Sequence, residues 1–338
     1  MTARLHVVLL AGGTGSRFWP MSRASRPKHM LRLFGAKSLL EAAWERARVL
    51  APASRIWVVV PRSLRRAVER QLPGLRPERT IVEATSKGTA AAFGLAARNV
   101  AAADPKAVVA VLPTDHVVDD AKGFARSVRQ AAEASADGGI VCLGVRPDRP
   151  STGFGYLEVG RRSGPGGASP VRRFVEKPKA DRARAFARSG RHLWNVGVVV
   201  AGARTILDAL ARHAPSIHRA ATGGPAAWAK APARSFDRAV LEKVDGLRVV
   251  PLASRWTDVG SWDAAAALAS SRRGRAAVSV GSPGSVVFGD GRVVALVDVP
   301  GVVVVDTPDA VLVVSRRSAE KVRDLVAKLA RERPKVLR

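Results

Sequence analysis

Apolar runs and segments of helical spacing alternate along the first 150 residues of the chain. Strands buried on both faces are apolar without alternation, and this pattern predicts strands at residues 4–13, 55–61, 79–84, 107–116 and 139–145. Between them, apolar positions three and four apart predict helices at residues 37–51, 62–72, 88–103 and 123–136. Repeated βα units predict an α/β fold with a Rossmann-like mixed, mostly parallel sheet flanked by helices. Ligands of such sheets bind beyond the carboxyl ends of the strands, here after Leu10, residues 81–83 and Leu112.

The pattern changes in the second half of the chain. Residues 153–159 and 171–178 are expected to be two strands that flank the Gly/Pro/Ser-rich segment 161–170. After about residue 270, short valine-rich runs separated by turns precede a single amphipathic helical segment, residues 318–332. We therefore expect a large domain of residues 1–270 and a small β-rich, β-helix-like module of residues 271–338.

The composition is that of a globular protein, with 47% hydrophobic residues. The only cysteine, Cys142, cannot form an internal disulfide and is expected to be a buried, inert thiol. The chain does not start with cations followed by a long apolar segment, and its valine-rich runs are too short to span a bilayer. A cytoplasmic enzyme or binding protein without a membrane partner is expected.

Lysine and arginine outnumber the acids 56 to 28, which gives a formal net charge of +28. The cations are spread over helix-like segments rather than gathered in a basic tail, and aromatic residues make up only 5%. Base stacking on single strands needs aromatic platforms. We therefore expect a solvated basic surface and no nucleic-acid partner, whereas small anionic substrates fit the charge.

The stretch "VVLLAGGTGSRFWPMSRASRPKHM", residues 7–30, joins a buried strand to glycines and cations. Gly12, Gly13 and Gly15 allow the backbone to approach a phosphate with its N–H groups. The spacing matches neither the dinucleotide fingerprint nor the P-loop. Arg17 and Lys28 on a proline-stiffened loop instead suggest a polyphosphate held by fixed cations. The alternative is an ordinary basic loop after a core strand.

This stretch resembles the signature of the mannose-1-phosphate guanylyltransferases, within the sugar nucleotidyltransferase superfamily. The resemblance continues in order through "VLPTDH", "TGFGYLE", "RRFVEKP", "LWNVGVVV", "SFDRAVLEK" and "WTDVGSWDA". It implies a nucleotidyltransferase (GT-A-like) catalytic domain in residues 1–270. The nucleotide-binding residues that it implies are Leu10, Ala11, Gly12, Gly13, Gly15, Arg17, Lys28, Glu83, Gly88, Thr89 and Asp115.

Two aspartates are candidate ligands of Mg²⁺, which prefers one or two carboxylates together with phosphate oxygens and water. Asp115 follows an expected strand, and the resemblance makes Asp258 in "WTDVGSW" its partner. In the alternative interpretation each aspartate caps the helix that follows it. Asp263 lies inside the expected helix, and His116 is interpreted as structural.

For the sugar phosphate, the resemblance implies Gly155, Glu176, Lys177, Asn195, Gly197 and Asp237. It assigns sugar hydroxyls to Glu176 and the phosphate to Lys177. As neighbours in an expected strand, these two side chains should point to opposite faces unless a twist or bulge re-aims one of them. The alternative is a solvated Glu–Lys pair. Val196 and Val198 replace the family's usual Ser and Met, which bears on hexose selectivity.

Glu83 is a candidate for base selection, because a carboxylate accepts hydrogen bonds from both N1–H and the 2-amino group of guanine. The family pattern around it has Arg and Asn where this chain has Lys87 and Gly88, while Thr89 and Ala90 match.

The implied reaction converts GTP and mannose 1-phosphate into GDP-mannose and diphosphate by in-line attack of the sugar phosphate on the α-phosphorus. Arg17, Lys28 and Lys177 are its expected catalytic residues, acting by charge neutralisation and alignment. Three alternatives remain: another hexose 1-phosphate or nucleotide, a glycosyltransferase, and a basic nucleic-acid-binding module. The glycosyltransferase would need a D-x-D pair, which the adjacent Asp119 and Asp120 do not supply. A homodimer is left open.

Overall fold

The computed structural model describes residues 4–13, 15–160, 164–269, 277–289 and 291–337. Contacts divide the chain into two compact units. Unit 1 comprises residues 1–12, 43–113 and 118–256, and unit 2 comprises residues 13–42, 114–117 and 257–338. The domain boundary predicted between residues 270 and 271 falls outside the described residues and stays a prediction.

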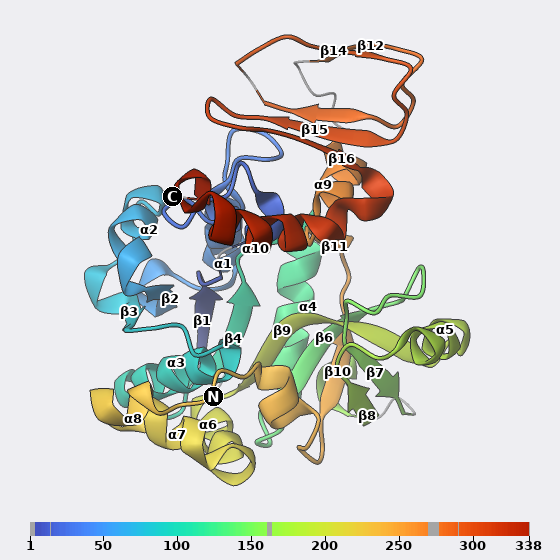
Figure 1. Cartoon of the computed structure of the whole chain (residues 1–338). Helices are drawn as coiled ribbons and strands as arrows, with labels where there is room; N and C mark the ends of the chain where they lie inside the picture. Colours follow the sequence, from blue (N-terminus) through green and yellow to red (C-terminus); the bar gives the residue numbers. More distant parts are fainter. Residues whose placement is uncertain (1–3, 14, 161–163, 270–276, 290, 338) are drawn as a thin grey trace. The chain divides into compact units, whose positions relative to one another are not determined.

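Unit 1 is built on a nine-stranded sheet in the order β3-β2-β1-β4-β9-β6-β10-β8-β7 (Figure 1). Its strands are β1 Leu5–Leu10, β2 Ile56–Pro61, β3 Thr80–Glu83, β4 Val108–Pro113, β6 Val141–Val145, β7 Tyr156–Val159, β8 Ser169–Val175, β9 His192–Gly202 and β10 Arg248–Pro251. Strands β3, β2, β1 and β4 are parallel, as the βα pattern predicts, whereas β8 and β9 run against the other strands. The prediction of a mixed sheet with mostly co-directional strands is confirmed.

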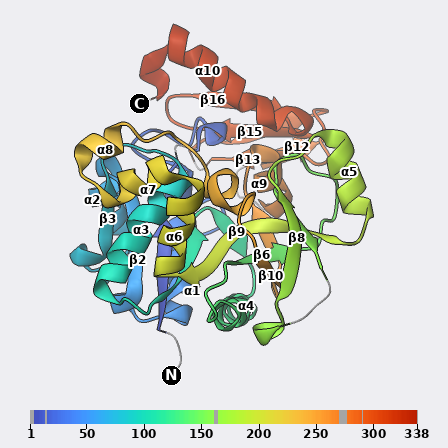
Figure 2. The ribbon, with the colours of Figure 1, turned by 90° about the horizontal axis from the view of Figure 1, so that it is seen from below.

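Helices lie on the sheet of unit 1 and supply much of its core. The helices of the chain are α1 Leu39–Leu50, α2 Arg65–Gln71, α3 Thr89–Ala103, α4 Ala121–Ala134, α5 Ala180–Arg188, α6 Ala203–His213, α7 Pro215–Thr222, α8 Pro225–Ala229, α9 Trp262–Ala269 and α10 Val322–Glu332. Figure 2 shows α3, α6 and α7 grouped together, with α4 apart from them. Small residues allow this close packing: a Cβ added at Gly94 of α3 would lie 2.6 Å from the Cβ of Ala221 in α7. The buried alanines of α3 join Val8, Val59 and Val109 of the sheet in one apolar cluster.

Unit 2 contains the β-rich module, whose strands are β12 Ala277–Val280, β13 Val286–Phe288, β14 Val294–Val297, β15 Val302–Asp306 and β16 Val311–Ser315. Val278 pairs with Ala295 in one parallel pair, and Val287 pairs with Val304 in the other, so both pairs join positions 17 residues apart. A constant offset between parallel neighbours is the signature of a coiled β-helix. The predicted β-helix-like module is therefore confirmed. A remaining short pair, β5 His116–Val118 and β11 Trp256–Asp258, forms its own two-stranded sheet.

Aromatic packing in unit 2 fixes Phe18 and Trp19, which lie in the glycine-rich loop of residues 13–30. The ring of Trp262 in α9 lies between Phe18 and Phe288, with ring centroids 4.8 Å and 4.9 Å away. Its indole Nε1 donates a hydrogen bond to the carbonyl oxygen of Trp19 at 3.0 Å.

The described helices include none that combines the length and the apolar character needed to cross a membrane.

Candidate active site

The glycine-rich loop of unit 2 folds back on its own second half. Gly15 has a φ of +61°, and a Cβ there would lie 2.3 Å from the Cβ of Lys28. The hydroxyl of Ser22 donates a hydrogen bond to the carbonyl oxygen of Gly15 at 2.8 Å. Only glycine combines this φ with so close an approach. Gly15 therefore allows Lys28 to pack directly against the start of the loop.

Lys28 is the centre of a charged cluster within unit 2. Its side chain is only 8% exposed, and its Nζ lies 2.8 Å from Oδ2 of Asp115 and 3.6 Å from Oδ1 of Asp258. Oδ2 of Asp115 and Oδ1 of Asp258 therefore both lie close to the same ammonium group. Asp115 and Asp258 are 143 positions apart in the sequence. The structure thus brings together Lys28, Asp115 and Asp258, which are three of the residues predicted to act on the phosphates and the metal.

Neither Asp115 nor Asp258 caps the helix that follows it, which was the alternative interpretation. The helix that follows Asp115 is capped by Asp120, whose carboxylate accepts from the backbone N–H of Lys122 at 2.9 Å. At the start of α9 the hydroxyl of Ser261 accepts from the backbone N–H of Ala264 at 3.4 Å. The carboxylates of Asp115 and Asp258 remain directed at Lys28.

The electrostatics of the cluster favour an ionised Asp115. Burial raises the pKa of this carboxyl, but the nearby ammonium of Lys28 and the imidazole of His116 more than offset burial and hold the pKa well below its usual range. The neighbouring His29 is buried, and burial lowers its pKa to about 4, so it is neutral at physiological pH. The cluster thus presents one buried ammonium to two carboxylates.

Arg17, the other loop cation predicted to bind phosphate, lies nearer to solvent. Its Nε is 3.0 Å from a carboxylate oxygen of Glu320, and its side chain is 42% exposed. One guanidinium N–H also donates to the carbonyl oxygen of Gly260 at 3.4 Å. An exposed ion pair of this kind contributes at most about 1 kcal/mol, so the guanidinium can exchange Glu320 for an anionic ligand at little cost.

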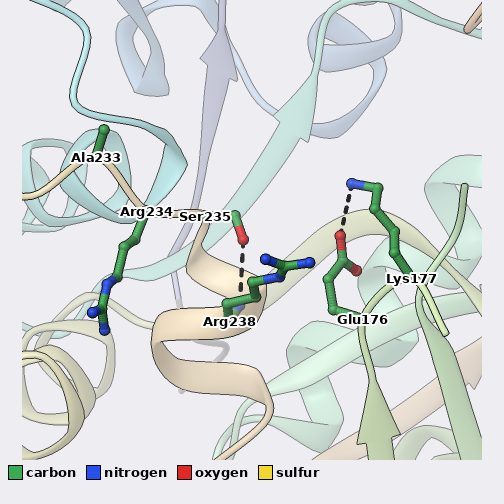
Figure 3. A pocket seen from close by; sticks show the side chains of 6 residues that line it. All are labelled: Glu176, Lys177, Ala233, Arg234, Ser235 and Arg238. Atoms are coloured by element: carbon green, nitrogen blue, oxygen red, sulfur yellow. Dashed lines mark hydrogen bonds and ion pairs between the residues drawn. The ribbon is translucent and has the colours of Figure 1, made fainter. Parts of the chain in front are cut away.

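Within unit 1, Glu176 and Lys177 form a second charged group. Contrary to the expected strand of residues 171–178, β8 ends at Val175, and Lys177 takes a left-handed conformation with a φ of +48°. Lys177 Nζ consequently lies 2.8 Å from Oε1 of Glu176 (Figure 3). The two side chains therefore do not follow the alternation of a strand: the left-handed backbone at Lys177 is the local twist that was named as the exception, and it brings both charges to one place.

Asn195 and Asp237 lie in a polar cluster with Glu176. The Asn195 amide donates to the carboxylate of Asp237 at 2.9 Å, and its own oxygen accepts from the backbone N–H of Gly197 at 3.0 Å. Gly197 has a φ of +71°, which turns the strand at this point. Burial, with the nearby charge of Glu176, raises the pKa of Asp237 to about 6. The cluster gathers hydrogen-bond acceptors that suit hydroxyl groups.

Gly155 is required for the packing of Glu176. A Cβ at this position would lie 2.6 Å from Cζ of Phe174 and 2.8 Å from a carboxylate oxygen of Glu176. Any larger residue would displace one of these side chains. Gly155 is therefore placed to shape the position of Glu176.

Glu83 is at the carboxyl end of β3 and is buried, with 4% of its surface exposed. Its Oε1 has no hydrogen-bond partner among the described residues. Burial raises the pKa of this carboxyl to about 7. A buried acceptor without a partner is costly, and a ligand that donates hydrogen bonds would remove that cost.

Comparison with known proteins places this arrangement in a family. A family model described as nucleotidyl transferase matches residues 6–272. The chain belongs to the nucleotidyl transferase family. A second model, described as the MannoseP isomerase/GMP-like beta-helix domain, matches residues 275–329. This nucleotidyl transferase is thus an enzyme that carries a β-helix module.

Similar proteins cover nearly the whole chain. The mannose-1-phosphate guanylyltransferase of Escherichia coli is 34% identical over 343 residues, which cover 94% of this chain and 72% of that protein. The xanthan biosynthesis protein XanB of Xanthomonas campestris pv. campestris is 34% identical over 342 residues, covering 95% and 72%. A crystal structure from Thermus thermophilus, described as a mannose-1-phosphate geranyltransferase, is 35% identical, with a TM-score of 0.86 over 96% of this chain and 99% of that chain.

Nucleotidyl transferases of this family generally use a divalent metal ion. The described residues contain no group of three or more His, Cys, Asp or Glu side chains arranged around one point. Asp115 and Asp258 nevertheless converge on one cation already, the ammonium of Lys28. Two carboxylates without further protein ligands suit a hard cation that also takes phosphate oxygens and water.

The segment that departs from the family pattern is tied to the residues before Asp237. Gly88 has a φ of +80°, and a Cβ there would lie 2.4 Å from the carbonyl oxygen of Arg234, so Asn would not fit without a shift. Lys87 Nζ donates to the carbonyl oxygen of Ala229 at 2.8 Å, and Thr89 Oγ1 accepts from the backbone N–H of Phe236 at 2.9 Å. In this nucleotidyl transferase, Lys87 and Gly88 have contacts that explain them structurally.

Other predictions concern residues outside these clusters. Cys142 is fully buried, and burial raises its pKa, as expected of an inert thiol. The backbone N–H of Ala11 donates to the carbonyl oxygen of Val59 at 2.9 Å, so it is engaged within unit 1. Val196 and Val198 are buried.

Part of the cavity beside Glu176 was not predicted from the sequence. This cavity has a volume of about 580 Å³ and is lined by Glu176, Lys177, Ala233, Arg234, Ser235 and Arg238 (Figure 3). The last four residues surround the predicted Asp237 in the sequence. Two further arginines so close to a predicted sugar-phosphate residue were the available signal.

Proposed function

We propose that this nucleotidyl transferase is a mannose-1-phosphate guanylyltransferase, which converts GTP and α-D-mannose 1-phosphate into GDP-mannose and diphosphate. The observation that carries the proposal is the position of Lys28 Nζ between the carboxylates of Asp115 and Asp258. A buried lysine beside two acids is suited to a triphosphate accompanied by a divalent cation. The similar protein of Escherichia coli named for this activity supports the choice of substrates.

In the proposed reaction, a phosphate oxygen of mannose 1-phosphate attacks the α-phosphorus of GTP. A new P–O bond forms as the bond between the α-phosphorus and the bridging oxygen breaks, and diphosphate leaves with that electron pair. The attacking oxygen is already anionic, so no protein base or nucleophile is required. Catalysis then consists of alignment and charge neutralisation.

Lys28 and Arg17 are the residues that we assign to the triphosphate and the departing diphosphate. Gly15 holds the backbone and Cβ of Lys28 in place, so only the outer part of this side chain has to move from the carboxylates onto the phosphates. Arg17 is free to exchange its exposed partner Glu320 for phosphate oxygens. Lys177 is assigned to the phosphate of the sugar, and Glu176, Asn195 and Asp237 to its hydroxyl groups.

Mg²⁺ is the cation that we assign to Asp115 and Asp258. When bound, it would neutralise phosphate charge and orient the triphosphate. The ionised state of Asp115 supports this assignment, since a metal ligand must be deprotonated.

Glu83 is assigned to the guanine base. Its ionised carboxylate would accept from N1–H and from the 2-amino group, which occupies the buried oxygen that has no described partner. Adenine offers no such pair of donors, and a site with an unpaired buried acceptor rejects the wrong base strongly.

The remaining assignments follow from the substrates. We place the reaction in the cytoplasm, where nucleoside triphosphates are available. We also assign catalysis to residues 1–270 and treat residues 271–338 as a separate module.

The test is a panel in which each of the four common nucleoside triphosphates is paired with mannose, glucose or galactose 1-phosphate and Mg²⁺. Diphosphate release is measured, and the nucleotide sugar is identified by mass spectrometry. We expect the highest kcat/KM with GTP and mannose 1-phosphate, and no release without a divalent cation. Faster turnover of another pair would overturn the substrate assignment, and no turnover of any pair would overturn the function.

A further inference from the structure

The cavity beside Glu176 contains more positive charge than the predicted sugar-phosphate residues supply. Of its six lining residues, Lys177, Arg234 and Arg238 are cations, and only Lys177 was predicted to act. All six belong to unit 1. The charge balance inside the cavity decides which of these cations can hold a phosphate.

Lys177 alone does not give the cavity a net positive charge. Its ammonium lies 2.8 Å from the carboxylate of Glu176, whose side chain is only 7% exposed. This pair is neutral as a unit, and the acid groups of Asp237 and Glu242 lie close enough to affect the same electrostatics. A phosphate monoester carries a charge of about −1.5 to −2 at pH 7. It therefore needs a second cation at this place.

Arg238 is the cation directed there. In Figure 3 its guanidinium points toward the Glu176–Lys177 pair. Among the described residues, no carboxylate lies within ion-pair distance of this guanidinium, and the hydrogen bond from Arg238 to Ser235 Oγ, at 3.3 Å, comes from the backbone N–H. The planar fork of an arginine matches two phosphate oxygens at once.

The position of Arg238 in the chain joins phosphate binding to sugar binding. It follows Asp237 directly, at the start of the short π-helical segment Asp237–Leu241. Asp237 is held by the amide of Asn195. A phosphate bound by Arg238 would therefore lie next to Asp237 and Asn195, which are assigned to the sugar hydroxyls.

We propose that Arg238, together with Lys177, binds the phosphate of the incoming sugar 1-phosphate. The proposal rests on the proposed function for the identity of the substrate, but not for the anion site itself. Arg234 has a different role: its side chain points away from the pair in Figure 3. Its backbone is what matters, since its N–H donates to the Lys87 carbonyl and its carbonyl accepts from Ala90 N–H.

Arg234 therefore provides a matched control, because it lines the same cavity and is also exposed. The experiment compares Arg238→Ala, Arg238→Lys and Arg234→Ala with the wild type. KM and kcat are measured for the sugar 1-phosphate at saturating GTP and for GTP at saturating sugar 1-phosphate, and thermal melts check folding.

Removal of a hydrogen-bonded charge partner typically weakens binding by roughly ten- to hundred-fold. We expect Arg238→Ala to raise KM for the sugar 1-phosphate by that factor, with KM for GTP changed less than about two-fold. Arg238→Lys should recover part of the loss, and Arg234→Ala should resemble the wild type. An unchanged KM in Arg238→Ala, or an equal loss in Arg234→Ala, would overturn the proposal.

A direct binding measurement separates this proposal from the proposed function. Calorimetric titration of the intact protein with mannose 1-phosphate, glucose 1-phosphate and inorganic phosphate requires no turnover. If no pair of substrates reacts but phosphate compounds bind the wild type about ten-fold more tightly than Arg238→Ala, the anion site stands without the guanylyltransferase assignment. If the enzyme turns over and binding is the same in both proteins, only the role of Arg238 fails.

Discussion

Substitution of Glu83 by Gln tests whether the enzyme keeps a costly buried carboxylate for its nucleotide. Burial raises the pKa of Glu83 from 4.5 to about 7. One pKa unit corresponds to about 1.4 kcal/mol, so ionising this group in the folded protein costs about 3 kcal/mol more than in the unfolded chain. Below pH 4.5 both states hold the proton, and the cost is absent. As the pH rises toward 7, only the unfolded state releases it, so the folded protein loses stability.

The Glu83→Gln protein cannot ionise at this position and should escape the loss. We expect its free energy of unfolding to exceed that of the wild type by about 3 kcal/mol more at pH 8 than at pH 4.5. Urea unfolding without nucleotide, over that pH range, measures the difference. Glu78→Gln is the control for a change of one charge, because Glu78 precedes the same strand but its side chain is 59% exposed.

The same substitution should damage nucleotide selection. An amide replaces one of the two acceptors by a donor, which would face donors of guanine. We expect a loss of about a hundred-fold or more in kcat/KM for GTP, with little change for ATP. Parallel pH profiles of stability for the wild type and Glu83→Gln would refute the burial argument, and an unchanged preference for GTP over ATP would refute the base assignment.

Four further predictions concern the loop of unit 2, its acids and the buried thiol. Asp258→Asn should lower kcat by at least about a hundred-fold and weaken Mn²⁺ binding in the presence of GTP, measured by electron paramagnetic resonance; near-normal values for both would contradict the metal assignment. Arg17→Ala should lose a similar factor in kcat, and unchanged kinetics would remove its role. Gly15→Ala should destabilise the protein by more than about 1 kcal/mol in urea unfolding, because a Cβ at this left-handed position would meet Lys28; unchanged stability would show that the loop is not fixed there. Cys142 should resist thiol reagents at pH 8 until the protein unfolds, and rapid labelling of the native protein would contradict its burial.

The parallel half of the sheet could be predicted from sequence because its strands are continuously apolar. Val7, Val8 and Leu9 are all buried, one after another, which distinguishes them from a strand with one solvated face. Local patterns also identified the opening loop, since glycines and cations follow β1 directly.

Contacts between distant residues could not be obtained from local patterns. The convergence of Asp115 and Asp258 on Lys28 joins segments far apart in the chain, and only the family resemblance suggested it. The pairing of Glu176 with Lys177 depends on a left-handed backbone at a lysine, which residue preferences disfavour. Arg238 was missed because it lies on a π-helical turn, Asp237–Leu241, which no local sequence pattern predicted.

The proposed reaction requires that Lys28, Asp115 and Asp258 act together on one nucleotide through a divalent cation. A crystal structure with Mn²⁺ and a non-hydrolysable GTP analogue, with the metal located by its anomalous scattering, tests it most directly. We expect a Mn²⁺ peak within coordination distance of both carboxylates and of phosphate oxygens, with Lys28 Nζ moved onto the triphosphate. A metal peak that touches neither aspartate, or a triphosphate bound away from Lys28, would contradict it.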